Sequence, residues 1–465
     1  MTTRGTCALA LALLGCGAEA SDPCGDREPC QPEGQVQVAT WWGTRGELFT
    51  PFAILEESLR RRNRLEANLA HRLQTKDEHT AWVDEQLDPK NTSPLPLDVF
   101  SANNGDEVLR WTRCAASGDA PDAPRLLGLT RADLGQNGFR REWIEEVFPA
   151  EVMSTLQCAD EDETYALPVG IHRINTLVYN KKLFAAAGYD VDGAPANSPL
   201  TPLPKTLVEL HAAAARLADG LPAQEFRTDL PPSVFAVPGR DAWTLSIFVV
   251  ENLMLSLAND AQHYRTYWEG KGCDEGLLRR ALEEFEQLRP WFGDTNLRAP
   301  EAFSRVRSGQ SAMMVNGDWV AAEAPEDVGT MAFPGTAQYF VFTADVFALP
   351  DIPSADRWKG LAWLRAVTGD TTQLEFSAAK RALPARMELE GALAPHSPDA
   401  PQWVPSLPAI LPYRREGPFV NLQDQLKDWL LTEGATTESV LEYARAEYPK
   451  LAQQECGASD VRDPE

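Results

Sequence analysis

The sequence predicts an α/β fold in two lobes, and two observations support this prediction. Short strands alternate with helices along the chain, as in "VQVATWW" at 36–42 followed by a helix to about residue 62, and this alternation is typical of parallel β-α-β units. The chain has 465 residues, which is too long for one ordinary core. With 43% hydrophobic and 24% charged residues, the composition is that of a globular protein.

The first predicted strand and helix meet at a polar turn. Thr44 and Glu47 have the S/T-x-x-E spacing of a capping box, which is expected to begin the helix. A second strand is predicted at 97–102. It breaks at Asn103-Asn104-Gly105 and is followed by a helix that begins near Asp106.

The remaining elements continue the alternation. Pro168 keeps the start of 165–190 extended, and a strand and a helix follow, with Gly188 expected to end the helix. A further helix is expected to end at Gly369. The other predicted helices are 207–219 and 280–292, and the other predicted strands are 311–320 and 339–350.

The N-terminus predicts export. Residues 1–15 contain one charge, Arg4, and an apolar run that is too short to span a bilayer, as in a secretory signal peptide. The run ends in Leu13-Leu14-Gly15-Cys16, which resembles a bacterial lipobox, so Cys16 is the predicted lipidation site. Residues 16–34 are polar and are predicted to form a tether. The alternative for the apolar run is an ordinary buried N-terminal helix.

The net charge and the cysteines narrow the function. A formal net charge of −25 argues against a nucleic-acid partner and against docking on an anionic membrane surface, and it favours a neutral ligand. Six cysteines remain after Cys7 and Cys16 are set aside, and an even number in an exported chain indicates disulfides. No spacing of cysteines and histidines predicts a metal site, and no cofactor is expected.

Six segments occur in the order found in one protein family. They are "TWWGTRGE", "LDVFSANNGDE", "LPVGIHRINTLVYNKKLFAAAGYD", "SGQSAMMVNGDWV", "FPGTAQYFVFTADVFALP" and "QLEFSAAKRALPAR". In these segments the chain resembles the extracellular solute-binding proteins (family 1) of bacterial ABC sugar importers, and within them the group that binds glucose, mannose and related sugars. Asn103, Gln310 and Arg381-Ala382 depart from that group's pattern and leave the exact sugar open.

The resemblance implies a periplasmic-binding-protein fold of type II-like form, with three crossovers between the lobes and a ligand cleft. The implied division is 35–167 for the first part of lobe 1, 168–343 for the first part of lobe 2, 344–383 for the return to lobe 1, and 384–465 for the C-terminal part of lobe 2.

Cys114 and Cys158 flank the same lobe and are expected to pair. Cys24 with Cys30, and Cys273 with Cys456, are the remaining candidate pairs.

A sugar offers hydroxyl groups around its rim and an apolar C–H face, so a sugar site needs aromatic rings and planar polar groups. The candidates lie at strand ends or crossovers, where ligands of open parallel sheets bind. At least one of the two adjacent tryptophans is expected to face the ligand while the other packs inside. The predicted ligand contacts are Trp41, Trp42, Glu47, Asn103, His172, Trp243, Trp319, Asp345 and Lys380.

Each candidate also has a purely structural alternative. Glu47 could serve only the capping box, Asn103 only the turn before Gly105, and His172 only the hinge. Asp345 could pair with a basic residue, Lys380 or Arg381, instead of a hydroxyl group. Each tryptophan could be a core residue.

These observations together predict a non-enzymatic, monomeric sugar receptor. It would be held by lipid on a cell membrane, at the periplasmic face or at the cell surface. It would deliver a neutral mono- or oligosaccharide to the permease of an ABC transporter by hinge closure. Two alternatives remain open: a glycoside hydrolase that uses two carboxylates, and a sugar receptor for a sensor kinase or chemotaxis partner.

Overall fold

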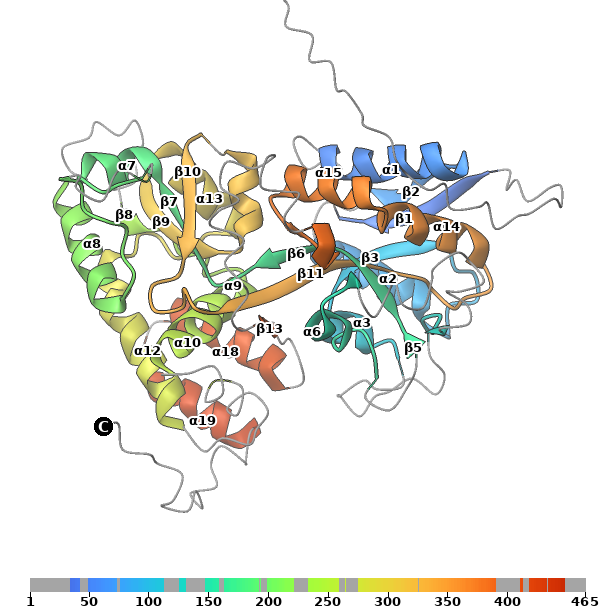
Figure 1. Cartoon of the computed structure of the whole chain (residues 1–465). Helices are drawn as coiled ribbons and strands as arrows, with labels where there is room; N and C mark the ends of the chain where they lie inside the picture. Colours follow the sequence, from blue (N-terminus) through green and yellow to red (C-terminus); the bar gives the residue numbers. More distant parts are fainter. Residues whose placement is uncertain are drawn as a thin grey trace, which may run out of the picture.

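The computed structural model shows a mixed α/β protein with two lobes, joined by strands that run between them (Figure 1). It describes residues 34–41, 49–72, 76–112, 125–130, 147–158, 163–191, 193, 199–220, 233–258, 264, 275–324, 326–389, 410–412, 418–432 and 434–447. The signal peptide, the lipobox, the tether and the capping box lie outside these residues. Among the described helices, none has the length and apolar character needed to cross a membrane.

Lobe 1 is built on a mixed seven-stranded sheet in the order β12-β6-β11-β3-β1-β2, with β13 paired to β11. The strands are β1 (Gln35–Thr40), β2 (Glu66–Arg72), β3 (Val99–Asn103), β6 (Ala166–Arg173), β11 (Phe340–Ala348), β12 (Leu383–Pro384) and β13 (Ile410–Pro412). β1 pairs in parallel with β2 and β3, which confirms the predicted parallel units. β11 is antiparallel to both β3 and β6, so the returning strand makes the sheet mixed.

Helices surround this sheet and bury its apolar side chains. They are α1 (Phe49–Asn63), α2 (Lys76–Leu87), α3 (Asp106–Leu109), α6 (Ala150–Met153), α14 (Arg357–Val367) and α15 (Asp370–Lys380), and a small hairpin of β4 (Leu129–Thr130) and β5 (Glu163–Thr164) adds to the lobe. Trp363 of α14 is fully buried. Its ring lies 6.0 Å from that of Phe52 and 5.3 Å from that of Phe347, and so joins α14, α1 and β11 in one core.

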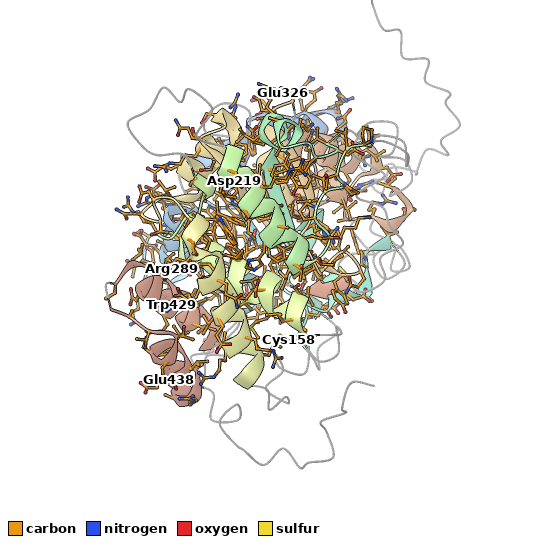
Figure 2. All side chains as sticks on the ribbon, turned by 90° about the vertical axis from the view of Figure 1, so that its left-hand side faces the viewer. Cys158, Asp219, Arg289, Glu326, Trp429 and Glu438 are labelled. Carbon is orange, nitrogen blue, oxygen red and sulfur yellow. The ribbon has the colours of Figure 1, made fainter. Side chains whose placement is uncertain are left out.

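Lobe 2 is built on a four-stranded sheet in the order β10-β7-β9-β8. The strands are β7 (Thr176–Asn180), β8 (Ser233–Phe235), β9 (Ser311–Asn316) and β10 (Val328–Ala332). The helices are α7 (Lys181–Ala186), α8 (Leu207–Gly220), α9 (Ala242–Ser246), the π-helix η3 (Ile247–Met254), α10 (Leu255–Leu257), α12 (Glu275–Leu288), α13 (Ala299–Ser308), α18 (Pro418–Leu431) and α19 (Thr437–Glu447), with short 3₁₀ turns η4 (Arg289–Trp291) and η5 (Asp318–Glu323). On the outer side of this lobe the Arg289 guanidinium lies over the ring of Trp429, 5.5 Å from its centre (Figure 2).

Both predicted helix ends are confirmed, and the two glycines differ in conformation. Gly188 follows the end of α7 with a φ of 81°, a left-handed conformation that favours glycine, which confirms that prediction. α14 ends at Val367 with Thr368 as its C-cap, so the helix ends directly before Gly369, as predicted. Gly369 has an ordinary φ of −72° and is the N-cap of α15, because the next helix begins immediately.

A buried polar network ties together two of the segments that carry the chain between the lobes. Asn175 separates β6 from β7, and its Oδ1 accepts a hydrogen bond from the Val341 N–H at 2.9 Å. The Arg173 guanidinium donates to the Tyr339 carbonyl at 2.7 Å and to Asn175 Oδ1 at 3.1 Å. The apolar core changes from lobe 1 to lobe 2 between Ile171 and Ile174. The division of the chain into four parts stays a prediction, and this network places the first crossing after Arg173.

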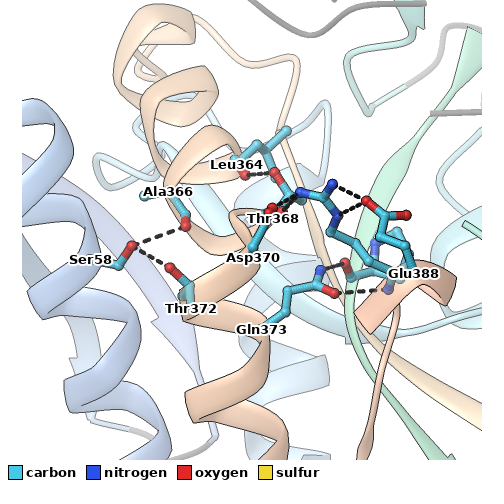
Figure 3. A network of polar contacts seen from close by, with 10 residues as sticks. Ser58, Leu364, Ala366, Thr368, Asp370, Thr372, Gln373 and Glu388 are labelled. Atoms are coloured by element: carbon cyan, nitrogen blue, oxygen red, sulfur yellow. Dashed lines mark hydrogen bonds and ion pairs between the residues drawn. The ribbon is translucent and has the colours of Figure 1, made fainter. Parts of the chain in front are cut away.

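A second polar network supports the segment that follows β12. Arg386 is buried and its guanidinium pairs with the carboxylates of Asp370 and Glu388. Gln373 accepts a hydrogen bond from the Arg386 N–H at 3.0 Å and donates one to the Pro168 carbonyl at 3.0 Å. Figure 3 shows Asp370, Gln373 and Glu388 converging on this network. α15 is thereby fixed against β6, the strand that enters the crossing.

This close packing of α15 on β6 depends on a glycine. A Cβ on Gly170 would lie 2.9 Å from the Phe376 ring and 3.2 Å from the Ala382 Cβ. We expect Gly170→Ala to reduce the free energy of unfolding by about 1–3 kcal/mol, the usual cost of overpacking. Urea denaturation of the full chain measures this. Gly220→Ala is the control, since no atom lies within 4 Å of its added Cβ, and equal unfolding midpoints for the two variants would contradict the prediction.

Candidate ligand site

The ends of two parallel strands, β1 and β3, carry the first candidates. Ser101 Oγ donates a hydrogen bond to Thr40 Oγ1 at 2.9 Å and joins the strand ends. Trp41 follows β1 and Asn103 ends β3, and both side chains are half-buried. The Trp41 ring lies 5.0 Å from the imidazole of His79. Trp42 and Glu47, the other candidates of this region, lie outside the described residues.

Asn103 lies directly opposite Asp345 of β11 in the antiparallel ladder. Side chains of directly opposed residues lie on the same face of a sheet and within contact range. Asp345 is buried, with an exposed fraction of 4%. The amide and the carboxylate therefore form one polar edge of the site in lobe 1.

Four buried side chains form a row of alternating charge beside that edge. Lys380 Nζ lies 2.6 Å from Asp345 Oδ2, and His172 Nε2 lies 3.1 Å from the same oxygen. His172 Nδ1 lies 2.7 Å from Asp318 Oδ1. The four side chains come from α15, β11, β6 and η5, so the row runs from lobe 1 into lobe 2. The structure thus gives Asp345 the ion pair with Lys380 that the sequence left open.

Burial and pairing act in opposite directions on the pKa values of this row. Burial lowers the pKa of His172, but the carboxylates of Asp318 and Asp345 outweigh it and hold this pKa above the usual range. Burial raises the pKa of Asp345, but Lys380 and His172 outweigh it and bring this pKa to about 2. Burial dominates at Asp318, whose pKa is raised. The two carboxylates therefore favour the protonated form of His172.

One oxygen of Asp345 remains available. Both cations bind Oδ2, and among the described residues no hydrogen bond reaches Oδ1 or the side-chain amide of Asn103. A carboxylate oxygen accepts hydrogen bonds and an amide both donates and accepts them. The two groups can together bind adjacent hydroxyl groups.

Two half-buried tryptophans extend the site in lobe 2. The Trp319 ring stands edge-on to His172 at 5.4 Å, and the Trp243 ring lies 6.2 Å from that of Trp319. Trp319 is packed on the α-carbon of Gly317, where an added Cβ would lie 1.8 Å from the ring. The structure thereby brings Trp243 and Trp319 together and connects them to lobe 1 through His172.

Sequence reasoning did not assign a role to Asp318, which forms the lobe 2 end of the row. This residue is 1% exposed, and its Oδ2 accepts a hydrogen bond from the Arg173 N–H. The signal was present in "VNGDWV", where an acid stands within an apolar segment. Its partner His172 lies 146 residues away, and no local pattern indicates that pairing.

Within the described part of the chain, no group of three His, Cys, Asp or Glu side chains gathers that could hold a metal ion. Cys158 is buried and disulfide-bonded. The other candidate cysteines lie outside the described residues, so the three cysteine pairings stay predictions.

Residues 137–374 match the family model of the bacterial extracellular solute-binding protein. The chain is 23% identical to a xylose/arabinose-binding protein of Haloferax volcanii over 50% of this chain and 48% of that protein. It is 23% identical to a probable sugar-binding periplasmic protein of Mesorhizobium japonicum over 76% of each chain. The chain thus spans about half the length of some curated relatives, including an ABC transporter extracellular-binding protein of Pyrococcus horikoshii at 47%.

Solved structures share the fold. A chitin oligosaccharide binding protein matches with a TM-score of 0.67 and 16% identity over 90% of this chain and 99% of that one. A bacterial solute receptor described as exclusive for β-D-galactopyranose matches with a TM-score of 0.68 and 13% identity over the same shares. These matches confirm the predicted two-lobed fold, and the relatives are solute-binding receptors rather than enzymes.

The raised pKa of His172 predicts how stability depends on pH. A folded-state pKa above the unfolded value stabilises the fold fully below about pH 6.5, the usual value for histidine, and this contribution is lost as pH rises through the raised pKa. We expect the free energy of unfolding of the wild type to fall between pH 6 and 9 by more than that of His172→Gln. Urea denaturation at each pH measures both slopes, and parallel slopes would contradict the prediction.

Proposed function

We propose a sugar-receptor function for this chain, which belongs to the family of bacterial extracellular solute-binding proteins. It binds a carbohydrate outside the cytoplasm and passes it to the permease of an ABC transporter without changing it. Xylose/arabinose-binding and probable sugar-binding proteins among its relatives support the carbohydrate class.

One observation carries the proposal: groups suited to a sugar follow one another from lobe 1 into lobe 2. Trp41 and Asn103 stand at neighbouring strand ends, and Asn103 opposes Asp345. His172 links Asp345 to Trp319 and, through it, to Trp243. Aromatic rings cover the apolar face of a sugar while the amide and carboxylate bind its hydroxyl groups.

The charges of the site favour a neutral ligand. Two carboxylates and two cations alternate along the buried row and compensate one another. An anionic ligand would compete with Asp345 for Lys380, and a cationic one would compete with Lys380 for Asp345, so each would leave a charge unpaired at a cost of several kcal/mol. Hydroxyl groups can instead bind to Asp345 Oδ1 and Asn103 without breaking an ion pair.

Hinge closure is the mechanism that we propose. The two crossing segments meet at the network of Arg173, Asn175 and Tyr339, so bending is expected on either side of this rigid cluster. A sugar that touches groups of both lobes binds the closed form more tightly and shifts the population toward it.

The finer parts of the function also belong to this proposal. The chain is a monomer, and its ligand is a neutral mono- or oligosaccharide of the glucose/mannose type. It is anchored by lipid on Cys16 at the periplasmic face of a membrane or at the cell surface, and Cys114 pairs with Cys158. Lipid on this residue would keep the receptor close to the permease, provided that more than one chain is attached.

Calorimetry over a panel of neutral mono- and disaccharides tests the ligand. We expect Asn103→Ala to weaken binding by about 0.5–1.5 kcal/mol, or roughly two- to tenfold, because it removes a hydrogen-bonding group. Trp319→Ala should weaken binding to every sugar accepted, because the ring covers a face that all sugars share. Asn296→Ala and Trp358→Ala, at exposed positions, are the matched controls and should bind like the wild type.

The panel can contradict the proposal in two ways. If no sugar binds the wild type, the assignment to carbohydrate fails. If a sugar binds the wild type, Asn103→Ala and Trp319→Ala equally, the receptor function stands and the position of the site is wrong.

Metabolic labelling with a radioactive fatty acid tests the anchor. Cys16→Ser should abolish labelling, because the thiol that receives the lipid is gone, whereas Cys7→Ser should leave it unchanged, because this residue departs with the signal peptide. Full labelling of Cys16→Ser would show that the chain carries no lipid at this position.

A further inference from the structure

We propose that Asp318 is a positioning residue for ligand binding: from lobe 2 it orients His172, which in turn holds Asp345 of lobe 1 with one oxygen presented to the ligand. The inference rests on the proposed sugar site. It assigns a role to a carboxylate that does not itself need to touch the sugar.

Asp318 is held at both of its oxygens. Oδ1 lies 2.7 Å from His172 Nδ1, and Oδ2 accepts the N–H of Arg173, the residue next to that histidine. A carboxylate fixed at two points cannot rotate, so it sets both the plane of the imidazole and the place of a proton on Nδ1. The Trp319 ring stands at 85° to the imidazole, with the two ring centres 5.4 Å apart.

With Asp318 and Asp345 both ionised, His172 must carry two protons to donate a hydrogen bond from each of its nitrogens. A neutral imidazole has a single N–H and could donate to Asp318 or to Asp345, but not to both. The imidazolium donates to Asp318 through Nδ1 and to Asp345 Oδ2 through Nε2, 3.1 Å away. Because the second carboxylate supports the proton, removal of either one leaves a buried imidazole that burial favours as neutral.

The two carboxylate oxygens of Asp345 consequently have different roles. Lys380 and His172 both bind Oδ2, and this leaves Oδ1 as the acceptor beside the Asn103 amide. With a neutral imidazole the Nε2 nitrogen could become an acceptor and repel Oδ2. Asp345 would then turn about its side chain, with Lys380 as its remaining cationic partner.

The series of contacts from Asp318 through His172 to Asp345 crosses from lobe 2 to lobe 1. Asp318 begins η5 of lobe 2, whereas Asp345 lies in the sheet of lobe 1. The charged groups around His172 are Asp318 from η5, Asp345 from β11, Lys380 of α15 behind Asp345, and Arg173 on its own strand β6. The state of the acceptor in lobe 1 therefore depends on contact with lobe 2.

The first test needs no ligand. Histidine of the full chain is labelled with ¹⁵N, and the His172 signal is identified by its loss in His172→Gln. We expect the imidazolium form at pH 7.5 in the wild type and the neutral form in Asp318→Asn. Asp327→Asn is the matched control, since this lobe 2 carboxylate pairs with Lys182 and not with the histidine. A neutral His172 in the wild type, or an imidazolium in Asp318→Asn, would overturn the proposal.

The second test measures sugar affinity against pH, a readout that a merely structural role would not move. With the best ligand of the panel, the dissociation constant of the wild type and of Asp327→Asn should stay flat from pH 6 to 8. In Asp318→Asn it should rise about tenfold or more as His172 loses its proton, the effect expected when a hydrogen bond between charged groups is lost. Adding His172→Gln to Asp318→Asn should remove the pH dependence. A flat profile for Asp318→Asn would overturn the proposal.

The two tests separate this inference from the proposed function. If no sugar binds the wild type, the carbohydrate assignment fails, while the imidazole titration still decides whether Asp318 holds the proton on His172. If Asp318→Asn does not fold, the wild type decides: an imidazolium at pH 7.5 with a flat affinity profile supports the role, and a neutral imidazole refutes it.

Discussion

The arrangement of this protein depends on a histidine held between two buried carboxylates where the lobes meet. His172 is 2% exposed and bridges Asp318 and Asp345. Buried charges are costly unless they are paired and hydrogen-bonded, and here each charge faces an opposite one. The row therefore imposes a constraint: neither carboxylate can leave the histidine without exposing an unpaired charge, and this constraint keeps η5 of lobe 2 against the crossing strand β6.

The crossing is rigid for a second reason. Arg173, next to the histidine, turns its guanidinium toward the Tyr339 carbonyl and Asn175 Oδ1, and so joins the outgoing and returning segments. The α15 helix lies close to β6 because Gly170 leaves room for the Phe376 ring. In the proposed hinge closure, this cluster would confine bending to the residues on either side of it. The candidate ligand groups at the ends of β1 and β3 would then keep their geometry while lobe 2 moves.

The candidate site combines buried charges that neutralise one another with half-buried side chains at its edge. Lys380 and His172 neutralise Asp345 on one oxygen, and the half-buried Asn103 and tryptophans stand where a ligand can reach them. The groups that stabilise the fold are thus distinct from those proposed to bind the ligand, because the buried ion pairs are formed without a ligand. In the proposed site, hydroxyl groups that bind the other oxygen add contacts without breaking these pairs.

The sequence by itself indicated the two-lobed α/β class and several of the strands and helices. Alternating strands and helices predicted the sheets, and strand ends predicted Trp41, Asn103, His172 and Asp345, because these signals are local and the carboxyl ends of strands bind ligands. Only the tertiary structure decided that Asp345 pairs with Lys380 and His172, and that Asp318 completes the row. Along the chain, Asp345 lies 35 residues from Lys380 and 173 residues from His172, and Asp318 lies 146 residues from His172. The physical reason is that a buried charge is paired by whatever the folded chain brings beside it, and no periodicity or spacing in the sequence records that neighbour.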